Sequence, residues 1–187
     1  VALLDGDFQF GDVGVLLNLN SPRSIIDLCE HIDELDSRFI ADVMTNHASG
    51  LRVLLPPPSP EMADLIAIDH LKSILTALRD HFDYILIDTP TSFAETTLTL
   101  LDGADTVLLV TTPEIPAIKN ARLFFDVSEQ LKYDEEKVSL LLNKYDPRTG
   151  ITAEAIRASI KHPIFASVSR EDRIVNMATN QGLPFAL

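Results

Sequence analysis

The stretch Val1-Ala2-Leu3-Leu4-Asp5-Gly6-Asp7-Phe8-Gln9-Phe10-Gly11-Asp12-Val13-Gly14 decides how the rest of the chain is interpreted. Its first four residues form an apolar run, which is typical of a buried strand in a parallel sheet. Two carboxylates follow at the carboxyl end of this strand, where open α/β sheets bind their ligands. Because side chains in a strand repeat every two residues, we expect Asp5 and Asp7 to start on the same face.

Further apolar runs predict further strands along the chain. They are Leu51–Leu55, Tyr84–Ile87, Thr106–Val110, Val138–Leu142 and Ile164–Val168. Most of these runs are continuous rather than alternating, as expected of strands that are covered on both faces. Segments with apolar residues at helical spacing lie between them. The alternation predicts an α/β fold, a doubly wound and mostly parallel sheet with helices on both faces.

Local signals predict where some helices begin and end. Ser59 followed by Pro60 is typical of a helix start, with proline at the first helical position. Thr152 is a candidate N-cap for the next-to-last helix. Gln181-Gly182 is expected to end the last helix, because glycine is common just beyond a helix C-terminus.

The composition limits the class of protein. Apolar residues make up 46% of the 187 residues, which favours one folded α/β domain over disorder. A formal net charge of −13 disfavours direct binding of nucleic acid or of an anionic membrane by the whole surface. Cys29 is the only cysteine, so no disulfide framework or cysteine metal cluster is expected, and a reducing, cytoplasmic setting fits. The five histidines lack ligand spacing.

Short segments follow five of the predicted strands, and a parallel sheet is expected to bring them together because its strand ends meet at one edge. They are Asp5-Gly6-Asp7, Pro56-Pro57-Pro58, Asp88-Thr89-Pro90, Thr111-Thr112-Pro113-Glu114 and Asn143-Lys144. Carboxylates and hydroxyls are the oxygen ligands that suit Mg²⁺ together with a phosphate. The edge is therefore predicted to hold a metal or phosphate site, although each aspartate could instead cap the helix that follows it.

Several of these segments together resemble the MinD/ParA group of deviant-Walker P-loop ATPases (SIMIBI-like NTPases). Ile85-Leu86-Ile87-Asp88-Thr89-Pro90 resembles the Walker B strand of that group, and Val1–Asp7 resembles its second acidic strand. Asn143-Lys144 resembles the end of its base-recognition strand, and residues 167–184 resemble its C-terminal segment. Residues 7–13 and 56–64 are most similar to the CpaE/TadZ branch, which implies a role in pilus assembly or polar positioning.

One part of the family pattern does not occur in the sequence. No G-x-x-x-x-G-K-[ST] pattern is found in the 187 residues, whereas the family carries its phosphate-binding loop before the acidic strand. Because the chain begins inside a predicted strand, we expect a truncated ATPase-like domain over residues 1–187 that lacks its first strand and P-loop. The resemblance implies an upstream P-loop segment in the parent protein and allows a receiver-like domain ahead of it. Weak or no binding of ATP is expected from this piece alone.

The resemblance also implies roles for individual residues. Asp7 would position the attacking water, Asp5 would support Mg²⁺ or a phosphate-binding lysine, and Asp88 would hold Mg²⁺. Asn143 and Lys144 would bind the adenine base, with Pro113 and Glu114 near the base and the dimer face. Each residue also has a structural alternative. Asp7 and Asn143 could be turn residues, Asp5 and Asp88 could cap the ends of their strands, and Glu114 could be an acid in the first turn of a helix. Phe8 and Phe10 are expected in a half-buried loop or, if exposed, in a dimer contact.

The implied function is an ATP- and Mg²⁺-dependent switch that forms homodimers and acts through protein partners of a pilus, secretion or polarity system. Such a protein is expected in the cytoplasm, with indirect recruitment to the inner membrane face or a cell pole. Two alternatives stay open: a non-catalytic scaffold of the same fold, and a phospho-accepting receiver-like regulator. The receiver pattern is imitated by the order Asp5/Asp7, Asp88, Thr111 and Lys144.

Overall fold

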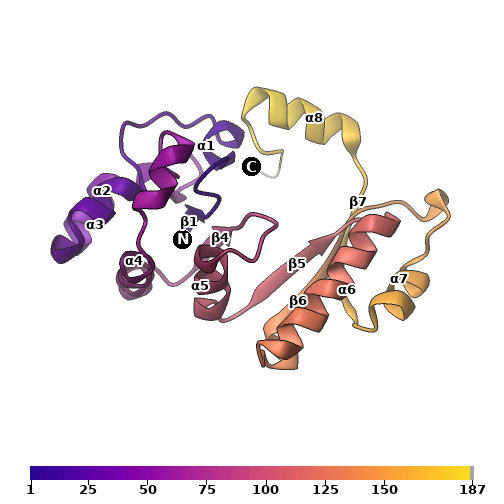
Figure 1. Cartoon of the computed structure of the whole chain (residues 1–187). Coiled ribbons are helices and arrows are strands. Elements are labelled where there is room, and N and C mark those ends of the chain that lie inside the picture. Colours follow the sequence, from indigo (N-terminus) through magenta and orange to yellow (C-terminus); the bar gives the residue numbers. More distant parts are fainter. Residues whose placement is uncertain (186–187) are drawn as a thin grey trace. The chain divides into compact units, whose positions relative to one another are not determined.

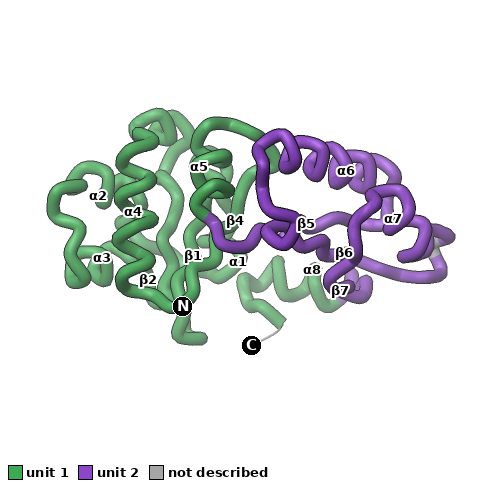
Figure 2. The backbone as a smooth tube through the Cα atoms, turned by 90° about the horizontal axis from the view of Figure 1, so that it is seen from below, with its two compact units in different colours: residues 1–103, 174–187 green, residues 104–173 purple. Residues whose placement is uncertain are grey.

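The computed structural model describes residues 1–185, which form two compact units (Figure 2). Unit 1 comprises Val1–Gly103 together with the described part of the segment that starts at Ile174. Unit 2 comprises Ala104–Arg173. The single domain expected over residues 1–187 stays a prediction.

In the described residues the sheet of unit 1 has four strands in the order β2-β3-β1-β4. The neighbouring β1 and β4 are labelled in Figure 1. The strands are β1 (Ala2–Asp5), β2 (Thr45–Asn46), β3 (Arg52–Leu54) and β4 (Ile85–Asp88). β1 is parallel to both β3 and β4, as the apolar runs predict. The short β2, which no apolar run signals, pairs antiparallel with β3.

The helices of unit 1 pack around a core that includes the fully buried side chains of Leu4, Leu54, Leu71 and Leu78. The α-helices are α1 (Val13–Leu16), α2 (Ile25–Glu30), α3 (Ser37–Val43), α4 (Ile68–His81), α5 (Glu95–Gly103) and the part of α8 (Asp172–Gln181) from Ile174 on. The short 3-10 helices are η1 (Ile32–Glu34) and η2 (Pro60–Leu65). Cys29 belongs to this core, as predicted, and burial raises the pKa of its thiol to about 11.

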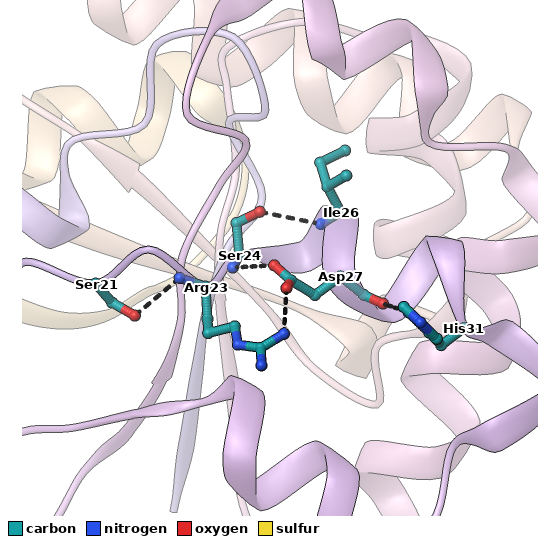
Figure 3. A network of polar contacts seen from close by, with 6 residues as sticks. All are labelled: Ser21, Arg23, Ser24, Ile26, Asp27 and His31. Atoms are coloured by element: carbon teal, nitrogen blue, oxygen red, sulfur yellow. Dashed lines mark hydrogen bonds and ion pairs between the residues drawn. The ribbon is translucent and has the colours of Figure 1, made fainter.

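A polar network fixes the start of α2 (Figure 3). The Ser24 hydroxyl accepts a hydrogen bond from the Ile26 N–H, and the Asp27 carboxylate accepts one from the Ser24 N–H, which together form a capping box. Arg23 donates to the same carboxylate at 2.7 Å. Burial raises the pKa of Asp27, but the hydrogen bonds from Arg23 and Ser24 and the charge of Arg23 together lower it below its ordinary value. The His31 ring contacts the Asp27 carbonyl. The two bonds of the capping box satisfy backbone N–H groups that a helix start leaves without intrahelical partners.

Unit 2 is a three-stranded parallel sheet with helices packed on it. Its strands, in the order β5-β6-β7, are β5 (Val107–Thr111), β6 (Val138–Tyr145) and β7 (Ile164–Ser169). Its helices are α6 (Ile115–Gln130), η3 (Glu135–Lys137), η4 (Pro147–Thr149) and α7 (Ala153–Ile160). The core lies between the sheet and these helices and includes Phe125, Leu140, Leu142 and Ile156.

The expectation that the apolar strands are covered on both faces is wrong for three of them. In the described residues β4, β5 and β7 are edge strands of their sheets, and each carries at least one apolar side chain that is at least half exposed: Leu86, Leu108, Val110 and Phe165. The alternate residues Ile87 and Leu109 pack against their cores instead. The continuous apolar sequence of these strands is therefore used on one face only.

Helix-end signals differ in accuracy. Thr152 caps α7, because its hydroxyl accepts a hydrogen bond from the Ala155 N–H, and α8 ends at Gln181 with Gly182 at a positive φ of 62°, both as predicted. The Ser59-Pro60 signal is followed by the 3-10 helix η2, and the Ser59 side chain makes no capping bond. The α-helix α4 begins only at Ile68, so the proline fixed the first turn without starting an α-helix.

Among residues 1–185, no helix is both long enough and apolar enough to cross a membrane.

Candidate functional site

The carboxyl ends of β1 and β4 bring two of the predicted site residues together. Asp5 and Asp88 are the last residues of neighbouring parallel strands and are partners in register. The Gly6 N–H donates to the Asp88 carbonyl at 2.7 Å and so continues the pairing one residue beyond β1. A Cβ atom on residue 6 would lie 2.5 Å from that carbonyl oxygen, so only glycine allows this approach.

The Asp5 side chain is fully buried and bonded to backbone groups. Its Oδ1 accepts a hydrogen bond from the Asp7 N–H at 3.2 Å, and its Oδ2 accepts one from the Val13 N–H at 3.0 Å. Burial raises the pKa of Asp5, the two N–H donors oppose that rise, and the charges of Asp88 and Asp7 add to it. Val13 is the first residue of α1, so the Asp5 carboxylate at the end of β1 also caps the start of this helix.

Asp7 does not continue the strand, since β1 ends at Asp5, and the expectation of a shared strand face does not apply to it. It lies in a turn, where its Oδ1 accepts hydrogen bonds from the Gln9 and Phe10 N–H groups at 3.3 and 3.0 Å. Asp7 is half-buried. The phenylalanines that follow separate: Phe8 is 5% exposed within the core, whereas Phe10 is 74% exposed.

Asp88 is exposed at the end of β4, and its charge is disfavoured by its surroundings. Partial desolvation raises the pKa of its carboxyl, the Thr89 N–H lowers it, and the nearby charges of Asp7 and Asp12 raise it further. Asp12 is a neighbour that the sequence did not single out. Its position just before α1, in the loop after an acidic strand, is the signal that could have indicated it.

The described residues contain no group of three or more His, Cys, Asp or Glu side chains arranged to hold a metal ion by themselves. Mg²⁺ does not require such a cage, because it is commonly bound by one or two carboxylates with phosphate and water. An exposed Asp88 oxygen with an uncompensated negative charge nearby is a donor of the right chemistry. The residues present therefore fit a magnesium ion that is shared with a phosphate.

The predicted base-binding residues lie in unit 2 and are described there. Asn143 is half-buried near the end of β6, and its Oδ1 accepts a hydrogen bond from the Lys144 N–H at 2.9 Å. Lys144 is exposed and adopts a left-handed φ of 53°, at a place where the pairing of β6 with β7 shifts register. With its oxygen engaged, the Asn143 amide nitrogen is left as a donor for a ligand acceptor.

Pro113 and Glu114 lie between β5 and α6. Pro113 is half-buried and Glu114 is exposed, and Glu114 precedes the first residue of α6 without a side-chain capping bond. Thr112 donates to Glu114 at 3.4 Å. The position is thus the N-cap residue rather than the first-turn acid considered as an alternative, and its carboxylate faces solvent.

The chain is similar to known proteins both in its sequence and in its structure. No family model matches the chain. The chain is 28% identical over 192 residues to the septum site-determining protein MinD of Thermotoga maritima, which covers 100% of this chain and 70% of that protein. Its structure resembles a ParA family ATPase from Chlorobium tepidum, with a TM-score of 0.90 and 19% identity over 97% of this chain and 76% of that one.

Two solved MinD structures have the same fold. One is MinD from Pyrococcus horikoshii complexed with Mg-ADP, with a TM-score of 0.79, 19% identity and coverage of 98% of this chain and 73% of that one. The other is the MinC:MinD complex of Aquifex aeolicus, with a TM-score of 0.76, 20% identity and coverage of 98% and 74%. The chain has the α/β fold of MinD/ParA P-loop NTPases and is similar to MinD along its whole length.

Proposed function

We propose that this chain is part of an ATPase in which the ends of β1 and β4 bind Mg²⁺ and the phosphates of ATP. The observation that carries the proposal is the register pairing of Asp5 with Asp88, with Asp7 in the adjoining turn. Phosphoryl transfer depends mainly on positioning and on stabilisation of charge, so a carboxylate edge of this kind is suited to it. The nucleotide bound to the Pyrococcus horikoshii relative supports the choice of ligand.

In this proposal the residues have separate roles. Asp88 holds Mg²⁺ through water, and Asp7 orients the attacking water molecule. Asn143 and Lys144 bind the adenine base, with Pro113 and Glu114 beside it and at a dimer face. When bound, Mg²⁺ neutralises the charge that develops on the phosphates.

The proposed cellular role is a dimerising positional switch in pilus assembly or polar localisation, as in the CpaE/TadZ branch. Residues 7–13 and 56–64 carry that part of the proposal. The protein would act in the cytoplasm through protein partners, with indirect recruitment to the membrane face or a pole, and without direct contact to nucleic acid. Size-exclusion chromatography with light scattering, with and without Mg-ATP, tests the homodimer.

The central experiment measures phosphate release by the protein expressed from its complete reading frame. Asp7→Ala is expected to lower kcat about a hundredfold or more, because it removes a group needed in the transition state. Asp88→Asn is expected to raise the Mg²⁺ concentration required for half-maximal activity. Asp64→Asn, which changes an exposed carboxylate elsewhere in unit 1, is the control and should match the unaltered protein.

A base-recognition variant completes the test. Asn143→Ala is expected to raise the KM for ATP about tenfold and to weaken discrimination against GTP, because a hydrogen-bond donor to the base is removed. Neither binding nor hydrolysis of Mg-ATP by the complete protein would contradict the proposal and favour the non-catalytic scaffold. Labelling of Asp88 by acetyl phosphate, without ATP-dependent activity, would favour the receiver-like regulator.

A further inference from the structure

The loop between β1 and α1, residues 6–12, is held from inside by one carboxylate. The two oxygens of Asp5 accept hydrogen bonds from N–H groups at the two ends of this loop, those of Asp7 and Val13. The residues that donate these bonds are six positions apart along the chain. A single buried side chain therefore closes the loop on itself.

Gly11 makes room for that carboxylate. A Cβ atom on residue 11 would lie 2.4 to 2.5 Å from the carboxyl carbon and both oxygens of Asp5, which is far inside van der Waals contact. Gly11 does not have a positive φ, so the need for glycine comes from this contact and not from backbone conformation. The Asp5 carboxylate is therefore enclosed by the backbone at Gly11 and by the N–H groups of Asp7 and Val13.

The same loop sets the position of Asp7. The Asp7 carboxylate accepts hydrogen bonds from the Gln9 and Phe10 N–H groups. The side chain of Phe8, the residue directly after Asp7, is buried in the core. The Asp7 N–H is itself bound to Asp5. The backbone on both sides of Asp7 is thus fixed, and its side chain is held by the residues that follow it.

We propose that Asp5 and Gly11 are positioning residues that hold the loop so that the Asp7 carboxylate stands where it can orient water. The proposal rests on the function proposed for Asp7. Asp5 acts through Asp7 and not as a metal ligand, because it is fully buried and both of its oxygens already accept backbone hydrogen bonds. Gly11 acts one step further away, by leaving space for the Asp5 carboxylate.

The first test uses the kinetics of the complete protein. Asp5→Asn replaces one accepting oxygen by an NH₂ group that faces a backbone N–H, and Gly11→Ala places a methyl group against the carboxylate. Each is expected to lower kcat about 10- to 100-fold, while the KM for ATP and the Mg²⁺ requirement change by less than about twofold. In combination with Asp7→Ala neither should slow the reaction further, because all three changes remove the same water-orienting function.

The second test needs no activity. Amide hydrogen exchange of the complete protein should become at least about tenfold faster at Phe10 and Val13 in Gly11→Ala, with no change at Leu4 in the core of β1. Gly103→Ala is the matched control, because a Cβ there would lie 3.6 Å from its nearest neighbour. It should leave exchange in the loop and kcat unaltered.

The outcomes separate the two proposals. If exchange at Phe10 and Val13 does not change, or if Asp5→Asn raises the Mg²⁺ requirement and its effect adds to that of Asp7→Ala, the positioning role is wrong. If the unaltered complete protein does not hydrolyse ATP, the proposed function fails, and the exchange result alone decides whether Asp5 and Gly11 hold the loop that carries Asp7.

Discussion

The pKa values of carboxylates at the strand ends are shifted in opposite directions in the two units. In unit 1, burial or partial desolvation and neighbouring negative charges raise the pKa values of Asp5 and Asp88. In unit 2, Arg148 donates two side-chain hydrogen bonds of 2.8 Å to Asp146, and its bonds and charge lower the pKa of that carboxyl to about 2. One edge gathers negative charge, whereas the other pairs it with an arginine.

This difference indicates at which edge the negative charge is already paired and at which edge it is available for a ligand. An arginine paired with a carboxylate needs nothing further, and at an exposed position it adds little to stability. A carboxylate cluster whose charge is disfavoured has a use for a cation, and shifted pKa values of this kind gather at functional sites. The comparison thus supports the proposed placement of Mg²⁺ on unit 1, apart from the sequence similarity.

The largest expected effect tests whether the two units have separate cores. Leu4 in unit 1 and Leu142 in unit 2 are both fully buried, so replacing either by alanine should lower the free energy of unfolding by about 2–5 kcal/mol. Amide hydrogen exchange in increasing urea should show the loss of protection mainly in the unit that carries the substitution. Leu65→Ala, at a 57% exposed position, is the control. An equal loss of protection in both units after either substitution would show that they unfold together and do not have separate cores.

A smaller effect compares the helix caps of the two units. Ser24→Ala removes half of the capping box of α2 and leaves a nearly buried N–H without its partner, whereas Thr152→Ala removes an exposed capping bond. We expect losses of about 1–2 kcal/mol and about 0.5–1 kcal/mol respectively, from urea denaturation followed by circular dichroism. Ser24→Asp and Thr152→Asp should restore most of each loss, because aspartate is also a good cap. A larger loss of stability in Thr152→Ala than in Ser24→Ala would contradict the expectation that the buried cap contributes more.

The smallest effect on stability concerns the arginine pair of unit 2. Because the folded pKa of Asp146 is depressed, its contribution to stability is present above its ordinary pKa of 3.8 and is lost as the pH falls through about 2. Arg148→Ala should move the titration of Asp146 back toward 3.8, as followed by carboxyl carbon chemical shifts. The titrations of Asp5 and Asp88 should stay above 3.8 in the same spectra. An unchanged Asp146 titration would mean that Arg148 does not set its pKa, and Arg122→Ala serves as the control.

Much of the fold could be predicted because apolar runs report on burial, and the six predicted strands all occur with ends shifted by a few residues at most. The two-residue β2 could not, since its pairing with β3 depends on a neighbour and not on an apolar run. Ser59-Pro60 misled because proline favours any first helical turn, and the turn here is 3-10. The pairing of Asp5 with Asp88 follows from parallel strands, but the fixing of Asp7 by Asp5 depends on a loop closure that strand periodicity does not describe.

The open edge of β5 has a consequence for the behaviour of residues 1–187 in solution. Its exposed Leu108 and Val110 stand on an uncharged strand whose outer N–H and C=O groups have no strand beside them in the described residues. Such an edge is a template on which another molecule can add its own strand. Solutions of this polypeptide should therefore scatter more light as its concentration rises, and a lysine in place of Leu108 should suppress that self-association.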